Sequence, residues 1–399
     1  MGTGAFDEAR LARVHDVLAS HVETGAVPGL VWMVARHGEA HAGAAGALRA
    51  DGGAPVERET LFRISSMSKP VTAAAALILV EECRIRLDDP VDEVLPELAD
   101  RRVLARPDGP IDDTVPAKRP ATLRDLLTFR LGLGMDFGAT GPQPTMQAMA
   151  EQGIPVGPPA PGRGVPPDEW MRRLGTVPLE RQPGEHWLYH TSAEVLSVLI
   201  ARVAGQPLPD FLRERIFEPL GMRDTAFSVA GANLDRFGPL YWTDPETGTR
   251  TEYDAPDGQW SAPPVFPNGA DGLVTTVDDY LAFAEMLLGG GEARGVRILS
   301  HPTARAMTND QLTDEQRRTG PDPTGATGWG FGVGVCVRGV NPARGVGCYG
   351  WDGGMGSTWS NDPVEDLVGI LLTNQAFSSP MPPAVVEDFW TATYAAVAD

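Results

Sequence analysis

Apolar side chains recur along this chain with two different periods, and the helical period appears first. Between residues 7 and 20, Leu11, Val14 and Leu18 fall on one side of a helix, which predicts an amphipathic helix. Residues 71–80 are rich in Ala, Leu and Ile and carry no charge, so they predict a buried helix. The same reasoning predicts helices over residues 121–127, 192–204, 210–217, 277–288 and 387–397, with a helical patch over 168–174.

Short apolar runs between turn residues predict strands at both ends of the chain. Residues 30–35 and 40–45 flank Arg36-His37-Gly38-Glu39, which is typical of a hairpin. Late in the chain, residues 331–337, 358–360 and 364–373 predict three more strands. We expect the N-terminal hairpin to join these late strands in one central antiparallel sheet. With helices packed around that sheet, the predicted fold class is α/β of the α+β kind.

Length and composition predict two lobes. A chain of 399 residues can bury a large core. Residues 1–100 and 264–399 would form an α/β lobe with the sheet, and residues 101–263 a mostly helical, loop-rich lobe, with a ligand cleft between them. Within the second lobe, residues 101–121 predict a surface loop. Residues 137–183, dense in Gly and Pro, are too long for an ordinary connection. They form either a substrate-shaping insertion such as a lid or an irregular packed loop.

The charge of the chain excludes some classes of partner. A net charge of −20 at pH 7 argues against nucleic acid, because phosphate binding needs a basic surface. It also disfavours anionic membranes, and no run of about 18 apolar residues predicts a membrane span. Residues 1–8 lack the basic and apolar regions of a secretory signal, so we expect a cytoplasmic protein. The sequence does not predict an oligomeric state.

Cysteines and histidines give no sign of a metal site. Cys83, Cys336 and Cys348 show no C-x-x-C pairing, and we expect them to be small buried apolar side chains. The histidines show no zinc-ligand spacing with Cys or Glu. The sequence therefore predicts neither a metal nor another cofactor.

Ser66 and Lys69 are the first candidates for chemistry. They lie three residues apart where the buried helix should begin, so their side chains share one face. A hydroxyl beside an amine predicts a nucleophile with its base. Lys69 and Lys118 are the only lysines, and arginine, which supplies the other cations, does not release its proton. The alternative is an incidental lysine, because S-x-x-K alone is a weak motif.

Two further segments carry candidate chemistry. Tyr189 precedes the predicted helix over residues 192–204, and a phenol beside an ammonium can pass protons to reacting oxygens. The glycine-rich segment 350–358 would let a backbone N–H face an oxyanion. The alternatives are a core tyrosine and a plain glycine-rich turn before a strand.

Taken together, the three segments resemble the serine β-lactamase and penicillin-binding-protein superfamily, above all class C β-lactamases and family VIII carboxylesterases. Ser66-Met67-Ser68-Lys69, Tyr189-His190-Thr191 and Trp351-Asp352-Gly353 occur in the order and rough spacing of that superfamily. The resemblance implies a β-lactamase/transpeptidase-like fold. It extends over residues 61–98, 122–133, 184–227, 269–290 and 350–372.

The resemblance also implies a role for each motif. Ser66 would attack an acyl carbon and Lys69 would accept its proton. Tyr189 would pass a proton to the leaving group and help to activate water. The backbone N–H groups of Ser66 and Gly354 would form the oxyanion hole, in which each donor contributes about 2.7–4 kcal/mol.

Departures from the family pattern bear on the substrate. Lactamases and transpeptidases have Lys-Thr-Gly or a histidine variant at the third motif, where it helps to bind a substrate carboxylate. This chain has Trp351, Asp352 and Gly353 there, and Thr191 where lactamases have Asn. These four residues are the candidates for substrate binding. Because the esterase branch has tryptophan at the third motif, we predict hydrolysis or acyl transfer on neutral, small-to-medium esters, with weak β-lactamase activity at most.

Other activities on the same scaffold stay open. They are a β-lactamase, a D-amino-acid peptidase or amidase, and a biosynthetic acyltransferase. A catalytically silent binding protein is a further alternative, although all three motif side chains with chemical roles are present. In each enzyme interpretation the partner is a small-molecule ester or amide.

Overall fold

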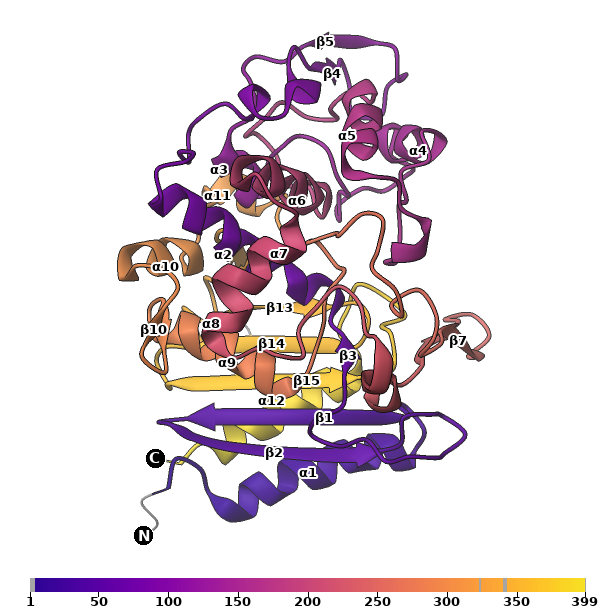
Figure 1. The fold of residues 1–399 in the computed structure, drawn as a ribbon, viewed down its shortest axis with the longest axis vertical. Coiled ribbons are helices and arrows are strands. Elements are labelled where there is room, and N and C mark those ends of the chain that lie inside the picture. Colours follow the sequence, from indigo (N-terminus) through magenta and orange to yellow (C-terminus); the bar gives the residue numbers. More distant parts are fainter. Residues whose placement is uncertain (1–3, 323, 340–342, 399) are drawn as a thin grey trace.

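A seven-stranded antiparallel sheet forms one half of the molecule (Figure 1). The structure, a computed structural model, describes residues 4–322, 324–339 and 343–398. The strand order is β11-β12-β13-β14-β15-β1-β2, so the first two strands of the chain lie beside its last strand. The strands are β1 (Gly29–Arg36), β2 (Glu39–Gly46), β11 (Thr327–Trp329), β12 (Gly334–Cys336), β13 (Tyr349–Gly353), β14 (Ser357–Asp362) and β15 (Leu367–Thr373).

Strand β1 joins the two ends of the chain. It pairs antiparallel with β15, where Met33 lies opposite Ile370, and with β2 on its other side. The turn between β1 and β2 contains His37 and Gly38, whose φ angles are 52° and 78°. Two successive positive φ angles are typical of a type I′ hairpin turn, which matches the twist of the strands. The predicted hairpin, and its pairing with a late strand, are confirmed.

Side chains alternate across β1, and each face of the sheet has its own core. Val31 and Met33 belong to the core that includes α2 and α9, whereas Leu30 and Trp32 pack in the core of α1 and α12. The sheet therefore lies between two helical layers. The bounds of these helices are α1 (Glu8–Glu23), α2 (Ser68–Glu81), α9 (Val277–Leu288) and α12 (Ala384–Ala396).

Helices α2 and α6 (Thr191–Ala204) form the buried centre above the sheet. Every residue of α2 from Ser68 to Leu79 is buried, as the uncharged run predicted. Thr122 caps α3 (Leu123–Leu127) through a reciprocal pair of hydrogen bonds with Asp125, which confirms the helix predicted over residues 121–127 and places its first residue at Leu123. The other helices are α4 (Pro144–Glu151), α5 (Pro167–Thr176), α7 (Leu208–Leu212), α8 (Glu218–Leu220), α10 (His301–Thr308) and α11 (Asp314–Arg317).

Several elements were not predicted, because they are too short to show a period. The predicted surface loop 101–121 contains a small hairpin, and residues 137–183 contain α4 as well as the expected α5. Met149 of α4 and Trp170 of α5 are buried, so this insertion is a packed part of the molecule. The division of the chain into two lobes, with residues 101–263 as the second lobe, stays a prediction. The remaining strands are β3 (Phe62–Arg63), β4 (Arg102–Leu104), β5 (Thr114–Pro116), β6 (Leu240–Thr243), β7 (Arg250–Asp254), β8 (Val274–Thr275), β9 (Glu292–Ala293) and β10 (Val296–Arg297).

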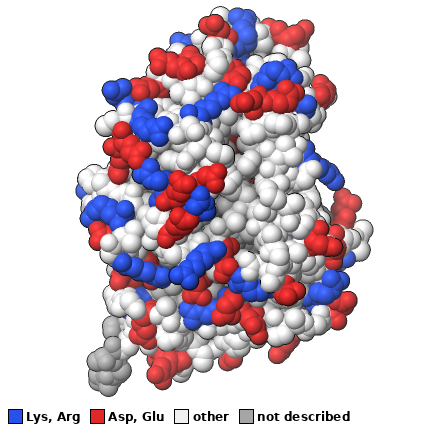
Figure 2. All heavy atoms as spheres, in the orientation of Figure 1, with Lys and Arg blue, Asp and Glu red and all other residues white. Residues whose placement is uncertain are grey.

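The surface carries interspersed acidic and basic side chains around a largely uncharged central area (Figure 2). Cys348 is buried and Cys336 is half-buried, but Cys83 is exposed, so the prediction of a buried side chain is wrong there. Cys83 follows the last turn of α2 with a positive φ of 56°, and this turn carries it out of the core. Among the described residues, no single helix is long and apolar enough to cross a membrane; α6 together with 208–220 passes that test as a pair bent by 79°.

Candidate active site

Ser66 lies in the turn that leads into α2. Residues Ser65–Met67 form a single 3₁₀ turn, and α2 begins at the next residue. Ser65 has a positive φ of 43°, a conformation that non-glycine residues seldom adopt and that is found at functional sites. The Ser66 residue is only 8% exposed, so the nucleophile candidate is largely shielded from bulk water.

The amine of Lys69 lies against this hydroxyl. Lys69 Nζ is 2.9 Å from Ser66 Oγ and 2.8 Å from the carbonyl oxygen of Ala270. Burial lowers the pKa of Lys69 from 10.5 to about 7, because a charged amine loses its hydration there, although the carboxylates of Asp271 and Glu194 oppose the effect. A large fraction of Lys69 is therefore neutral near pH 7 and able to accept a proton.

Tyr189 lies two residues before the start of α6 and is the third side chain beside Ser66 and Lys69. Its hydroxyl accepts a hydrogen bond of 2.6 Å from Nε1 of Trp351. An indole N–H can only donate, so the proton of the phenol stays free to be donated. Burial raises the pKa of Tyr189 above its usual value of 10, although hydrogen bonds with Ser66 and Trp351 oppose the effect. At neutral pH the phenol of Tyr189 therefore keeps its proton, whereas the amine of Lys69 can lose its own.

The end of β13 approaches the Ser66 turn closely. A methyl group added to Gly353 would lie 2.2 Å from the carbonyl oxygen of Ile64, so only glycine fits there. Ser357 also donates a hydrogen bond of 3.1 Å to the carbonyl oxygen of Ile64. This packing brings Gly354 beside the Ser66 turn. Among the described residues, the N–H of Gly354 has no hydrogen-bond acceptor, as an oxyanion donor requires.

Trp351 and Asp352 lie on opposite faces of β13. The ring of Trp351 packs on Tyr189, with ring centroids 5.6 Å apart. The carboxylate of Asp352 accepts a hydrogen bond from Thr358, which also accepts one from Trp390 of α12, on the far side of the sheet. Asp352 therefore has a structural partner away from the Ser66 side, and we do not include it among the proposed substrate contacts.

Thr191, another candidate for substrate binding, is deeply buried, and its contact with a substrate stays a prediction. It is the first residue of α6 and is only 2% exposed. Its backbone N–H donates to the carbonyl oxygen of Tyr189 across a tight turn. The preceding residue, His190, occupies the position beside Lys69 instead.

Aromatic rings surround Tyr189. Trp187 stacks on the phenol ring with centroids 5.6 Å apart, and Phe137 of the insertion lies 5.0 Å from it. Trp329 meets Trp351 edge to face, with 4.6 Å between centroids. This wall gives the site an apolar side and buries most of Tyr189, which is 9% exposed.

A polar cluster that the sequence did not predict lies behind Lys69. His190 Nδ1 lies 3.3 Å from Lys69 Nζ, while its Nε2 lies 3.5 Å from an oxygen of Asp271 and 3.7 Å from one of Glu194. Asn268 donates to Glu194 over 3.1 Å. The spacing of His190 and Glu194, one helical turn apart, was a usable signal. Asp271 gave none, because it comes from a loop far away in the sequence.

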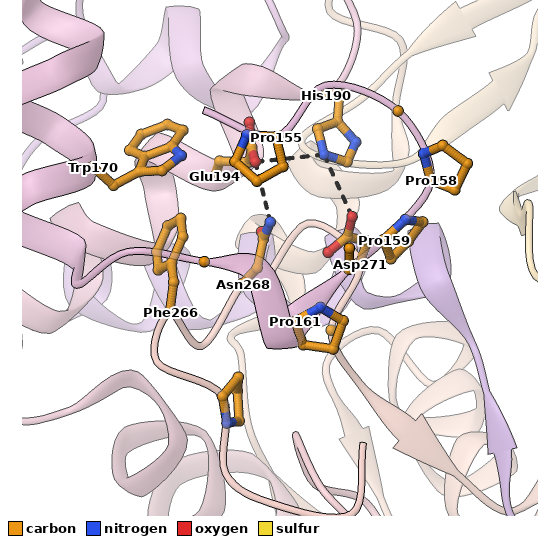
Figure 3. A pocket seen from close by; sticks show the side chains of 15 residues that line it. Pro155, Pro158, Pro159, Pro161, Trp170, His190, Glu194, Phe266, Asn268 and Asp271 are labelled. Carbon is orange, nitrogen blue, oxygen red and sulfur yellow. Dashed lines mark hydrogen bonds and ion pairs between the residues drawn. The ribbon is translucent and has the colours of Figure 1, made fainter. Parts of the chain in front are cut away.

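The insertion covers this cluster (Figure 3). Prolines of residues 155–161, together with Trp170 and Phe266, enclose a cavity of about 50 Å³ that opens onto His190, Glu194 and Asp271. A cavity of that size holds a few water molecules. Residues 137–183 therefore line the immediate surroundings of the site.

Comparison with known proteins decides the family. The family model described as Beta-lactamase matches residues 14–385. The chain belongs to the β-lactamase family. Protein Rv1367c of Mycobacterium tuberculosis is 40% identical over 333 residues, which cover 81% of this chain and 79% of that protein. Esterase EstB of Burkholderia gladioli is 30% identical over 402 residues, covering 96% and 95%.

A solved structure shows the same fold for this member of the β-lactamase family. EstCE1, described as a hydrolase with promiscuous acyltransferase activity, superposes with a TM-score of 0.78 at 28% identity and covers 97% of this chain and 99% of its own. The predicted β-lactamase/transpeptidase-like fold and the superfamily are confirmed. So is the prediction that the chain is an enzyme of the serine hydrolase class.

Proposed function

We propose that this β-lactamase-family protein is a carboxylesterase that acts through an acyl-enzyme on Ser66. The observation that carries the proposal is the 2.9 Å contact between Ser66 Oγ and an amine whose pKa is lowered to about 7. A neutral amine at that distance can take the serine proton as the hydroxyl attacks. The similarity to esterase EstB over most of both chains supports the same class of substrate.

In the acylation step, Ser66 Oγ forms a bond to the acyl carbon while its proton passes to Lys69. The carbonyl oxygen becomes an oxyanion that the N–H groups of Ser66 and Gly354 stabilise. When the bond to the alcohol breaks, Tyr189 donates its proton to the leaving oxygen, and the Lys69 ammonium supplies the proton that restores the phenol. The pair then has the protonation state in which it began.

Deacylation follows the same route in reverse, with water in place of the alcohol. The proton of the attacking water enters the Tyr189–Lys69 pair as the tetrahedral oxyanion forms again. Lys69 returns a proton to Ser66 Oγ as the acyl bond breaks, which releases the carboxylic acid and the free enzyme. An alcohol that reaches the acyl-enzyme first would give acyl transfer, an activity described for EstCE1.

The third motif supports an uncharged substrate. Trp351 stands where lactamases have a cationic or imidazole group, and it uses its N–H on Tyr189. Phe137, which is exposed, and Trp351, which is half-buried, offer apolar surface, and the fully buried rings of Trp187 and Trp329 support them. Neither feature attracts a carboxylate, so we favour neutral, small-to-medium acyl groups over penicillins. A cytoplasmic location and an ester or amide as the small-molecule partner stay predictions.

A substrate panel tests the proposal. Wild-type protein and Ser66→Ala would be compared on p-nitrophenyl acetate and butyrate, nitrocefin, a D-Ala-D-Ala peptide and an acyl thioester with an acceptor alcohol. We expect the highest kcat/KM on the short esters and complete loss of turnover in Ser66→Ala. Turnover that survives in Ser66→Ala would rule out Ser66 as the nucleophile, and nitrocefin turnover equal to ester turnover would rule out the substrate class.

A further inference from the structure

Three groups surround the amine of Lys69. They are Ser66 Oγ at 2.9 Å, the carbonyl oxygen of Ala270 at 2.8 Å and Nδ1 of His190 at 3.3 Å. A neutral amine has two N–H donors and one lone pair. The Ala270 carbonyl can only accept, so it takes one N–H. The direction of the lone pair then depends on whether His190 accepts the second N–H of the amine.

Two carboxylates determine which nitrogen of His190 carries the proton. Nε2 faces Asp271 at 3.5 Å and Glu194 at 3.7 Å, and ionised carboxylates only accept hydrogen bonds. The proton of the neutral ring therefore belongs on Nε2, which leaves Nδ1 as an acceptor toward Lys69. Asp271 and Glu194 are only 6% and 5% exposed, so bulk water does not replace these carboxylates as the neighbours of Nε2.

We propose that His190 is a positioning residue that accepts the second N–H of neutral Lys69 and so directs the amine lone pair at the Ser66 hydroxyl. The inference rests on the esterase mechanism proposed above and names a residue outside its three motif side chains. Once Lys69 has taken the serine proton, its three N–H groups have three acceptors in the same places. The same neighbours thus serve both protonation states without rearrangement, which keeps the reorganisation cost of the proton transfer low.

The backbone at His190 is strained in a way that holds the ring in this place. Its φ and ψ are 81° and −64°, and the N–H of Thr191 donates to the carbonyl oxygen of Tyr189 over 3.1 Å. These values define a γ-turn of the rare, strained kind. Strain of this sort persists only where the surrounding structure enforces it, and it is concentrated at functional sites. Here it lets adjacent residues approach the same amine, with the Tyr189 ring centroid at 4.6 Å and His190 Nδ1 at 3.3 Å from Lys69 Nζ.

Two substitutions at His190 distinguish the role of a hydrogen-bond acceptor from that of the imidazole ring. His190→Gly removes the imidazole and tolerates the positive φ, whereas His190→Asn also tolerates it and places a carbonyl oxygen near the position of Nδ1. We expect His190→Gly to lower kcat on p-nitrophenyl butyrate at least about tenfold with little change in KM, because a misdirected base weakens the transition state only. His190→Asn should recover at least about fivefold of that loss, and added imidazole should partly rescue His190→Gly.

Each kcat would be expressed per Ser66 labelled by a fluorophosphonate, so that unfolded molecules are not counted. A His190→Gly variant within about twofold of wild type, or a His190→Asn variant no better than His190→Gly, overturns the proposal. If His190→Gly does not fold, a loss above about tenfold in folded His190→Asn overturns it as well. Failure of wild-type Ser66 to label would instead refute the proposed function, and this inference with it. The groups facing His190 are Lys69, Tyr189, Glu194 and Asp271, so the pH profile of each variant is recorded in parallel.

Discussion

Replacing Lys69 by methionine should stabilise the protein at neutral pH while it abolishes turnover. The unfolded chain keeps Lys69 protonated up to a pH of about 10.5, whereas the folded protein binds that proton only below about pH 7. Between these values the unfolded state binds more protons, so the stability of the wild type rises with pH. The cost of burying the amine is present in full below pH 7 and disappears above pH 10.5.

The size of the effect follows from the same two values. At about 1.4 kcal/mol for each pKa unit, a fall from 10.5 to about 7 costs about 5 kcal/mol of unfolding free energy at low pH. Lys69→Met removes this cost, but it leaves the Ala270 carbonyl without its partner, which costs about 1–3 kcal/mol at every pH. The pH-dependent part of the stability difference is therefore the quantity to measure, because the cost at the Ala270 carbonyl is the same at every pH. Between about pH 6.5 and 9.5 the stability difference between mutant and wild type should shrink by about 3 kcal/mol.

Urea unfolding of the two proteins across this pH range measures that change. Lys118→Met is the matched control, because Lys118 is the only other lysine and its side chain is 70% exposed, beside Glu185. It should show no comparable dependence on pH. A Lys69→Met difference that stays constant within about 0.5 kcal/mol from pH 6.5 to 9.5 would refute the claim that burial lowers the pKa of Lys69.

Two other substitutions test the rest of the site. Tyr189→Phe should lower kcat/KM, which reports acylation, about a hundredfold on alkyl esters but much less on p-nitrophenyl esters, whose leaving group needs no proton; equal losses of kcat/KM on both would contradict the role as proton donor. Gly353→Ala should reduce the rate of Ser66 labelling about a hundredfold, because the added methyl would lie 2.2 Å from the Ile64 carbonyl and displace the Gly354 N–H. Gly354→Ala, whose methyl would meet nothing within 4 Å, is the control and should label at nearly the wild-type rate.

The sequence predicts the part of the site that depends on local spacing. Ser66 and Lys69 are one helical turn apart, so any helix that begins there brings them together. The sheet closure between β1 and β15 was also predictable, because both strands are short apolar runs at the two ends of the chain. The roles of Tyr189 and Gly354 came from family resemblance rather than from the residues alone.

Strand register and loop geometry set the limits of prediction. Whether Trp351 or Asp352 faces Ser66 depends on the register of β13, and a shift of one residue exchanges the two faces. The sequence offered both residues as substrate contacts, whereas the structure pairs Trp351 with Tyr189 and Asp352 with Thr358. His190 was missed because its place beside Lys69 results from a strained turn, which no hydrophobic pattern reports.

The central claim is that a neutral Lys69 is the base for Ser66. The rate at which a fluorophosphonate labels Ser66, followed by mass spectrometry of the tryptic peptide, measures that step without a proton donor for the leaving group. We expect the rate to rise with pH through an apparent pKa near the value of about 7 for Lys69 and to level off above it. A rate that is independent of pH across this range, or that rises only near the ordinary lysine pKa of about 10.4, would contradict the account.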